Sequence, residues 1–320
     1  LDVTGADIGC LEEGEITTFL LVQALRQGGD PASIPGLAVR DGSDVTLTGP
    51  GEYIHDLSQL PRIPYDLFPS RKWLRIGRFY TRHYQQPHWH FDDRIISIHG
   101  GRGCPYRCNF CYHHSKARYR DINDMMEETA RLLVEYDANM VYFGDDLVIA
   151  TPKRVAELLD GIPRLPRKVE FSVSCRFNIL EKLDDGALEA LAACGCRIMG
   201  LGIESGSDRI LKVMNKRITT DMVRHGMTRL KRVGILPTVS IMVGQVSETV
   251  LDVALSERLM VETTRENPNT QYAFTIATPF PGSPMFDDCV ARGLIADEYD
   301  FYRRFDPLRQ HCALTVNASD

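Results

Sequence analysis

A chain of 320 residues can bury a sizeable core, and its length favours one large domain with an accessory piece. Its 43% hydrophobic and 25% charged residues are typical of a globular protein, and the net charge of -6 excludes the broad basic field of a general nucleic-acid binder. No apolar run reaches the roughly 18 residues that span a bilayer, and Leu1–Cys10 lacks the pattern of a secretory signal. We therefore expect a cytoplasmic protein with neither nucleic acid nor a membrane as partner.

The first seventy residues predict one helix, one hairpin and a connecting segment. Glu15–Arg26 places apolar side chains at helical spacing, and Gly28–Gly29 ends the helix. Gly36–Arg40 and Val45–Thr48 alternate as the two strands of a hairpin do. Pro61–Pro69 contains three prolines and indicates a linker. Because the chain opens without Met, in what resembles the middle of a strand-and-turn unit, we expect a fragment of a longer protein.

Short apolar strands alternate with helices from residue 91 onward. The six predicted strands are Ile95–His99, Met140–Phe143, Val169–Val173, Ile198–Ile203, Pro237–Val243 and Tyr272–Ala277. Asp124 and Glu127, as a capping box, and Thr151–Pro152 indicate helix starts between them. This repetition predicts an α/β fold, a partial (β/α)6 TIM-like barrel with its site at the carboxyl ends of the strands.

Three of the nine cysteines crowd into eight positions directly after the first predicted strand. Cys104, Cys108 and Cys111 therefore lie on a loop at a carboxyl strand end, and such a cluster is typical of metal binding in a reducing compartment. Iron–sulfur clusters usually take four thiolates, so three local cysteines either await a remote fourth or leave one iron open to a substrate. Zinc is the competing metal, and a structural zinc site would need a fourth ligand such as His113 or His114.

The spacing Cys-x3-Cys-x2-Cys, with the aromatic Phe110 before the last cysteine, resembles the radical S-adenosylmethionine (SAM) superfamily. The resemblance implies that Cys104, Cys108 and Cys111 are the metal ligands and catalytic residues, holding three irons of a 4Fe-4S cluster whose fourth iron chelates SAM. It places Phe110 beside the cofactor. A reducing donor such as flavodoxin or ferredoxin would supply the electron that yields a 5'-deoxyadenosyl radical.

The segment after the second predicted strand resembles another motif of this family. Gly144, Asp145 and Asp146 stand where the family often has Gly-Gly-Glu against the SAM amino group, and either aspartate offers the acceptor that an ammonium needs. Acidic residues after a strand are also common helix caps. Arg176, just past the third strand, is a candidate for the SAM carboxylate, with an ordinary surface arginine as the competing interpretation.

Two later segments also resemble cofactor-binding motifs of the family. Glu204 and Ser205 end the fourth strand in a segment similar to Gly-Ile-Glu-Ser-Gly, which lies close to the SAM ribose. The following Leu211–Lys216 is interpreted as a short helix with a solvated face. Gly244, at the end of the fifth strand, matches the first residue of a Gly-x-Pro-Gly-Glu-Thr pattern, although Val246 and Ser247 replace its Pro-Gly.

The beginning of the chain resembles the end of the cobalamin-binding domain that precedes the barrel in one subgroup. The resemblance rests on Glu12–Glu15 and Ile34–Leu37, and it adds cobalamin to the cofactors expected of the protein. The domains we expect are the carboxyl-terminal part of a cobalamin-binding-like α/β domain at 1–50, a linker at 51–93, the radical SAM barrel at 94–290 and the start of a further segment at 291–320.

Members of that subgroup methylate carbon or phosphorus, or close rings on small molecules. The resemblance therefore implies a cobalamin-dependent methyltransferase or cyclase with a small-molecule substrate. One alternative is a radical methylthiotransferase acting on RNA or protein, but the cysteine-bearing amino-terminal domain expected of it is not seen, since only Cys10 precedes Cys104. A second alternative is a non-catalytic zinc or iron–sulfur binding module.

Overall fold

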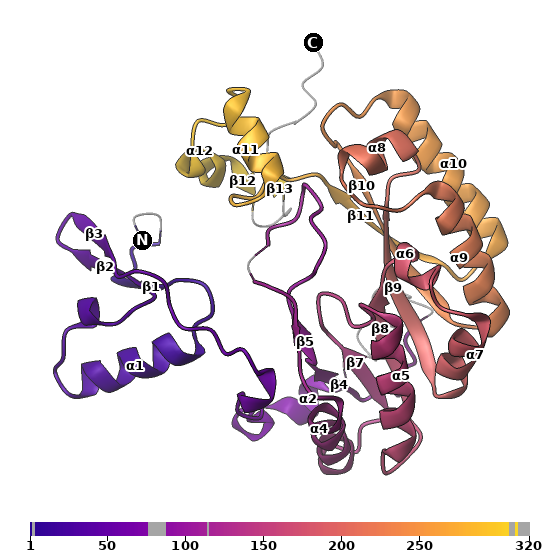
Figure 1. Ribbon diagram of the computed structural model, residues 1–320, viewed down its shortest axis with the longest axis horizontal. Coiled ribbons are helices and arrows are strands. Elements are labelled where there is room, and N and C mark those ends of the chain that lie inside the picture. Colours follow the sequence, from indigo (N-terminus) through magenta and orange to yellow (C-terminus); the bar gives the residue numbers. More distant parts are fainter. Residues whose placement is uncertain (2–3, 76–87, 114, 307–310, 313–320) are drawn as a thin grey trace. The chain divides into compact units, whose positions relative to one another are not determined.

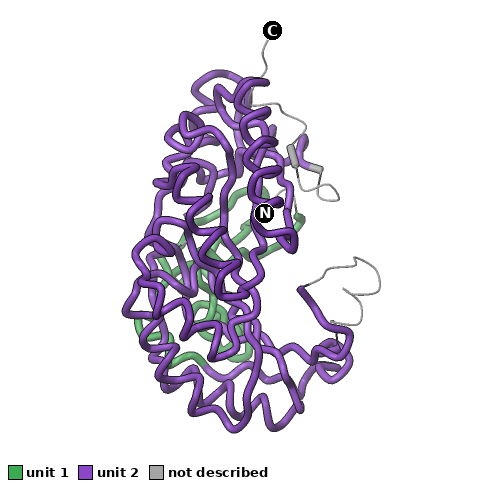
Figure 2. Tube along the Cα trace, turned by 90° about the vertical axis from the view of Figure 1, so that its right-hand side faces the viewer, with its two compact units in different colours: residues 1–60 green, residues 61–320 purple. Residues whose placement is uncertain are grey.

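The computed structural model describes residues 1, 4–75, 88–113, 115–306 and 311–312. The chain divides into two compact units, Leu1–Leu60 and Pro61–Asp320 (Figure 2). This boundary falls inside the predicted linker 51–93, and residues 61–75 and 88–93 belong to the larger unit. Among the helices of the described segments, none combines the length and apolar character that a membrane span needs.

The smaller unit is a three-stranded antiparallel sheet with one helix. Its elements are β1 (Ile8–Cys10), α1 (Glu15–Arg26), β2 (Leu37–Asp41) and β3 (Asp44–Leu47), with the strands in the order β1-β2-β3. The predicted helix and hairpin are thus confirmed. Along α1, Phe19, Val22 and Leu25 recur at helical spacing and are exposed, so the helix presents an apolar stripe.

The larger unit is built on a six-stranded parallel sheet (Figure 1). Its strands are β4 (Ile95–Ile98), β7 (Met140–Phe143), β8 (Glu170–Cys175), β9 (Cys196–Glu204), β10 (Leu236–Val243) and β11 (Gln271–Ile276). They lie in chain order across the sheet, and every neighbouring pair is parallel. All six predicted strands are therefore confirmed, and among the described residues β4 and β11 remain as edges of a partial barrel.

Helices connect successive strands and cover the outer face of this sheet (Figure 1). They are α4 (Ile122–Glu135), α5 (Pro152–Gly161), α6 (Phe177–Leu180), α7 (Asp185–Ala193), α8 (Asp208–Val213), α9 (Thr220–Val233) and α10 (Val250–Glu266). The helix α2 (Ser70–Trp73) precedes β4 in the chain, and α11 (Pro284–Ala291) and α12 (Glu298–Arg304) follow β11. Two short ribbons complete the unit: β5 (Gly101–Arg102) with β6 (Arg118–Tyr119), and β12 (Phe305–Asp306) with β13 (His311–Cys312).

The helix starts test two capping predictions. Thr151 caps α5 by accepting a hydrogen bond from the Arg154 amide, as predicted. The predicted capping box at Asp124 is wrong, because α4 begins earlier and Asp121 is its cap, accepting from the amides of Asn123 and Asp124. An acidic residue three positions before Asp124 thus satisfies the free amides of the first turn.

One continuous core holds the strands and helices of the larger unit in place. Buried side chains of the sheet pack against buried leucines of the helices; they include Ile96, Val141, Phe171, Met199 and Ile241 from the strands and Leu132, Leu158, Leu188, Leu230 and Leu259 from the helices. Close-packed interiors deform little, so the carboxyl ends of the strands are held as a rigid frame.

Candidate functional site

The loop that carries Cys104, Cys108 and Cys111 is fixed by hydrogen bonds to the neighbouring strand ends. The Gly103 amide donates to Asp146 Oδ2 at 2.9 Å, beyond the end of β7. Asn215, beyond β9, donates from Nδ2 to the Arg107 carbonyl at 2.6 Å. Gly103 has a φ of +73°, and a Cβ there would lie 2.7 Å from the Ser115 carbonyl oxygen, so the turn into the loop requires glycine.

The three cysteines line one cavity of about 500 Å³ at the carboxyl end of the sheet. The other residues that line it and bear on its chemistry are Tyr106, Phe110, His113, Asp146, Ser174, Arg176, Gly202, Glu204, Lys216 and Ser240. They come from the cysteine loop, from the carboxyl-terminal parts of β8, β9 and β10, from the segments after β7 and β8, and from the turn after α8 that carries Lys216. The structure thus brings together seven of the residues that the sequence analysis selects: the three cysteines, Phe110, Asp146, Arg176 and Glu204.

Cys108 is the most buried of the three cysteines, with 3% of its surface exposed. The Arg176 guanidinium approaches it, with Nη1 3.5 Å from Cys108 Sγ. A hydrogen bond with Cys111, and then the positive charges of Lys216 and Arg176, lower the pKa of the Cys108 thiol to about 5. The same hydrogen bond and burial raise the pKa of Cys111. The cavity therefore favours a thiolate, the form that binds metal.

The end of β9 supplies a buried ion pair to the cavity. Lys216 Nζ donates to Glu204 Oε1 at 2.7 Å, and the Ser240 hydroxyl donates to Glu204 Oε2 at 3.0 Å. Glu204 has a φ of +68°, a left-handed conformation that costs a residue other than glycine about 1–3 kcal/mol and is concentrated at functional sites. A Cβ on Gly202 would lie 2.1 Å from Glu204 Oε1, so any larger residue there would displace the side chains of the pair.

The segment after β7 places its two aspartates differently. Asp146 lines the cavity, whereas Asp145 lies behind the cysteine loop, where its Oδ1 accepts from the Gly100 amide at 2.6 Å. Asp145 Oδ2 is buried without a hydrogen-bond partner, and burial raises the pKa of this carboxyl. Gly144 donates its amide to the Ile98 carbonyl at 3.0 Å and does not line the cavity.

Two other residues selected from the sequence also lie outside the cavity lining. Ser205 is fully buried, accepts from the Ser207 amide at 3.2 Å and lies 3.4 Å from the Ser256 hydroxyl of α10. Gly244 donates its amide to Glu248 Oε2 at 2.6 Å. The structure therefore gives both residues contacts that shape the chain next to the site and does not bring them to the cysteines.

Lys216 is the charged cavity residue that the sequence analysis did not select. It lies beyond the helix α8 in the segment interpreted as solvated, yet only 5% of it is exposed. Its Nζ lies 5.8 Å from the centre of the Phe110 ring, within the range of a cation–π contact. The resemblance of its segment to the family was the only signal that pointed to it.

A single zinc ion is poorly served by this arrangement. Tetrahedral zinc with bonds of about 2.3 Å needs sulfurs about 3.8 Å apart. Among the described residues, the cysteines form no group of three ligands whose ligand atoms all lie within 4.8 Å. His113 lines the cavity, with Nε2 3.3 Å from the Cys108 carbonyl oxygen, and His114 lies outside the described residues. Three thiols that line one cavity together with the cations Arg176 and Lys216 fit an anionic iron–sulfur cluster better.

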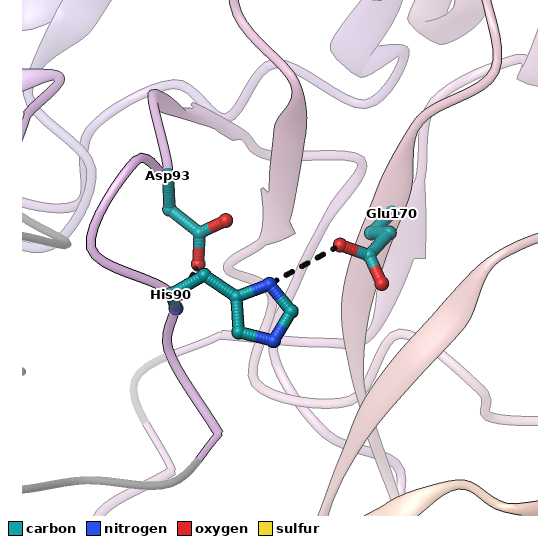
Figure 3. Close-up of side chains that lie close together, drawn as sticks. All are labelled: His90, Asp93 and Glu170. Atoms are coloured by element: carbon teal, nitrogen blue, oxygen red, sulfur yellow. Dashed lines mark hydrogen bonds and ion pairs between the residues drawn. The ribbon is translucent and has the colours of Figure 1, made fainter.

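At the amino end of the sheet, His90, Asp93 and Glu170 form a group whose ligand atoms all lie within 4.8 Å of one another (Figure 3). The buried Arg197 guanidinium bonds to all three, with Nη1 3.0 Å from His90 Nδ1 and hydrogen bonds to both carboxylates. Its positive charge already offsets the acidic residues. We therefore interpret this cluster as a structural ion-pair network.

The model of the radical SAM superfamily matches residues 98–258 of the chain, the part that contains the cysteine loop and the strands up to β10. An uncharacterized methyltransferase of Pyrococcus horikoshii is 26% identical over 302 residues, covering 92% of this chain and 61% of its own length. A tRNA-2-methylthio-N(6)-dimethylallyladenosine synthase of Bacteroides thetaiotaomicron is 30% identical over 175 residues, covering 50% of this chain and 38% of its own.

Solved structures with a similar fold include the radical SAM methyltransferase TsrM of Kitasatospora setae. Its structure with tryptophan substrate and a SAM analogue has a TM-score of 0.71 at 20% identity, covering 90% of this chain and 55% of that one. A second structure of the same protein, with cobalamin and a [4Fe-4S] cluster bound, has a TM-score of 0.69. The chain spans 61% or less of the length of these proteins.

Proposed function

Because the chain belongs to the radical SAM superfamily, we propose that it is part of a cobalamin-dependent methyltransferase or cyclase that acts on a small molecule. The observation that carries the proposal is that Cys104, Cys108 and Cys111 line one cavity with acidic and basic side chains from several strand ends. When bound, the 4Fe-4S cluster supplies one electron that breaks the bond between the SAM sulfur and C5', giving methionine and the 5'-deoxyadenosyl radical.

The acidic residues of the cavity suit the polar groups of SAM. Asp146 is the better candidate than Asp145 for the methionine ammonium, because Asp146 lines the cavity and Asp145 does not. Glu204 suits the two ribose hydroxyls, since each carboxylate oxygen keeps a second lone pair beside its bond to Lys216 or Ser240. Lys216 holds the carboxylate in place.

A role for cobalamin is supported by the smaller unit and by TsrM, which was solved with cobalamin bound. The exposed stripe of Phe19, Val22 and Leu25 on α1 is expected of part of a larger domain, because an apolar stripe is normally covered. We assign residues 1–50 to the end of a cobalamin-binding domain. Titration of the full-length protein with hydroxocobalamin tests this assignment, and the absence of a bound corrinoid spectrum would contradict it.

A methylthiotransferase is the less favoured alternative. A putative methylthiotransferase of Methanocaldococcus jannaschii is 25% identical over 90% of this chain, so coverage does not separate it from the Pyrococcus methyltransferase. The similar fold of the methyltransferase TsrM over 90% of this chain supports the methyltransferase. The net charge of -6 also gives no general attraction to RNA.

We further propose that the protein works in the cytoplasm with flavodoxin or ferredoxin as electron donor.

Anaerobic reconstitution of the protein with iron and sulfide tests the proposed function. We expect the wild type to take up a 4Fe-4S cluster and to form 5'-deoxyadenosine from SAM and a reductant. Each of Cys104→Ala, Cys108→Ala and Cys111→Ala should lose both properties, because each removes a ligand. Cys196→Ala is the matched control, since Cys196 is equally buried at the start of β9. Binding of one zinc in place of iron, or a full cluster in a Cys108→Ala protein, would reject the proposal.

A further inference from the structure

Every nitrogen of the buried Arg176 guanidinium already has a partner within the protein. Nη1 lies 3.5 Å from Cys108 Sγ, Nη2 donates to the Lys216 carbonyl oxygen and Nε donates to Asn178 Oδ1 at 3.3 Å. Cζ lies 3.9 Å from the centre of the Tyr106 ring, which covers the guanidinium. Asn178 Nδ2 in turn donates to the Tyr106 hydroxyl at 2.9 Å. The group is held in one orientation, with its Nη1 edge toward the sulfur.

The environment of this contact strengthens it. Arg176 is 7% exposed and Cys108 3% exposed, whereas Cys104 and Cys111 are only partly buried. Hydrogen bonds from a charged donor are roughly twice as strong as neutral ones, and a low local dielectric raises their effect. A surface arginine would lack these properties, so the surface interpretation of Arg176 does not hold.

We propose that Arg176 is a positioning residue that donates a charge-assisted hydrogen bond to the Cys108 ligand sulfur and thereby raises the reduction potential of the cluster. Hydrogen bonds to cluster sulfurs and nearby positive charge favour the reduced, more negative state. This inference rests on the proposed function, in which Cys108 is a cluster ligand. It gives Arg176 a role other than binding the SAM carboxylate, because its donors are directed elsewhere.

Redox titration of the reconstituted protein without SAM, followed by electron paramagnetic resonance, tests this inference. In Arg176→Met we expect the ratio of reduced to oxidised cluster at a fixed potential to fall about tenfold, which is about 59 mV for one electron. Arg176→Lys keeps the charge but loses the planar fork, so its potential should lie between the two. Arg258→Met, which removes an exposed arginine of α10, is the control for net charge and should match the wild type.

The possible outcomes separate the two proposals. A wild-type protein that binds no cluster rejects the proposed function itself. A normal cluster in Arg176→Met with an unchanged potential overturns the inference, and weaker SAM binding in that protein would assign Arg176 to the SAM carboxylate instead. If Arg176→Met does not fold or bind iron, the inference is tested on wild-type protein labelled with 15N-arginine. A 15N hyperfine coupling to the reduced cluster is then expected without SAM, and its absence overturns the inference.

Discussion

The two ends of the parallel sheet use similar charged residues in opposite ways. At the amino end, His90, Asp93 and Glu170 lie close together (Figure 3). Arg197 bonds to all three, so the charges of this network satisfy one another. At the carboxyl end, the charged groups line a cavity of about 500 Å³ together with three thiols. Charge alone therefore does not mark the functional end. What marks it is charge beside open space and beside groups that bind metal.

The largest effect on stability is expected at the amino end. Arg197→Met should lower the free energy of unfolding by about 3–5 kcal/mol, because it leaves the buried Asp93 carboxylate without its partner. Urea unfolding measures the loss, and iron uptake by the folded protein should not change. Arg167→Met, which removes an exposed arginine near the same end, should leave the midpoint unchanged. Loss of iron binding in folded Arg197→Met would contradict the assignment of the amino end to stability and the carboxyl end to function.

A smaller loss of stability is expected at the carboxyl end. Lys216→Met should cost about 1–3 kcal/mol, because Glu204 keeps its bond to Ser240 and faces a cavity that water can enter. SAM affinity should fall about tenfold, since the carboxylate loses the group that holds it. Isothermal titration with SAM measures the affinity. If stability falls as much as in Arg197→Met while SAM affinity stays the same, the pair is structural and the comparison fails.

The smallest effect concerns the pH dependence of stability. Burial raises the pKa of Asp145 above its ordinary value of 3.8 in the folded protein, so the folded state holds this proton more tightly than the unfolded state does. The contribution of Asp145 to stability is therefore present below pH 3.8 and is lost as the pH rises through the raised pKa. Asp145→Asn cannot ionise.

The stability of Asp145→Asn relative to the wild type should therefore increase across that pH window and then stay constant. Unfolding in urea at a series of pH values gives the difference curve, in which the other titrating groups cancel. A difference that is flat, or that decreases with pH, would show that the buried carboxyl is not the strained group that the structure describes.

Much of the fold could be predicted because the signals are local. The strands are short apolar runs between helix starts such as Thr151–Pro152. The spacing of the three cysteines predicts a metal site. The wrong capping box at Asp124 shows the limit of such signals, because Asp121 competes for the same amides three residues earlier. Choosing between them needs the backbone conformation, which the sequence pattern does not specify.

The missed parts of the site depend on contacts between distant segments. Two features bury Lys216. Asn215 and Arg217 adopt positive φ values on either side of it, and its ammonium group forms an ion pair with the Glu204 carboxylate. No periodicity reveals such a turn. Likewise, Asp145 and Asp146 are equivalent in sequence, and only the path of the chain after β7 turns one to the Gly100 amide and the other to the cavity.

Three protein ligands that leave one iron for SAM are the central feature of the proposed site. Electron–nuclear double resonance of the reduced cluster, with SAM labelled by 15N at the amino group and 17O at the carboxylate, tests this directly. We predict couplings from both labels in the wild type. The Cys196→Ala control should show the same couplings, because it keeps all three proposed ligands. A reduced cluster in the wild type that shows neither coupling would contradict the account, because it would mean that every iron is already closed to SAM.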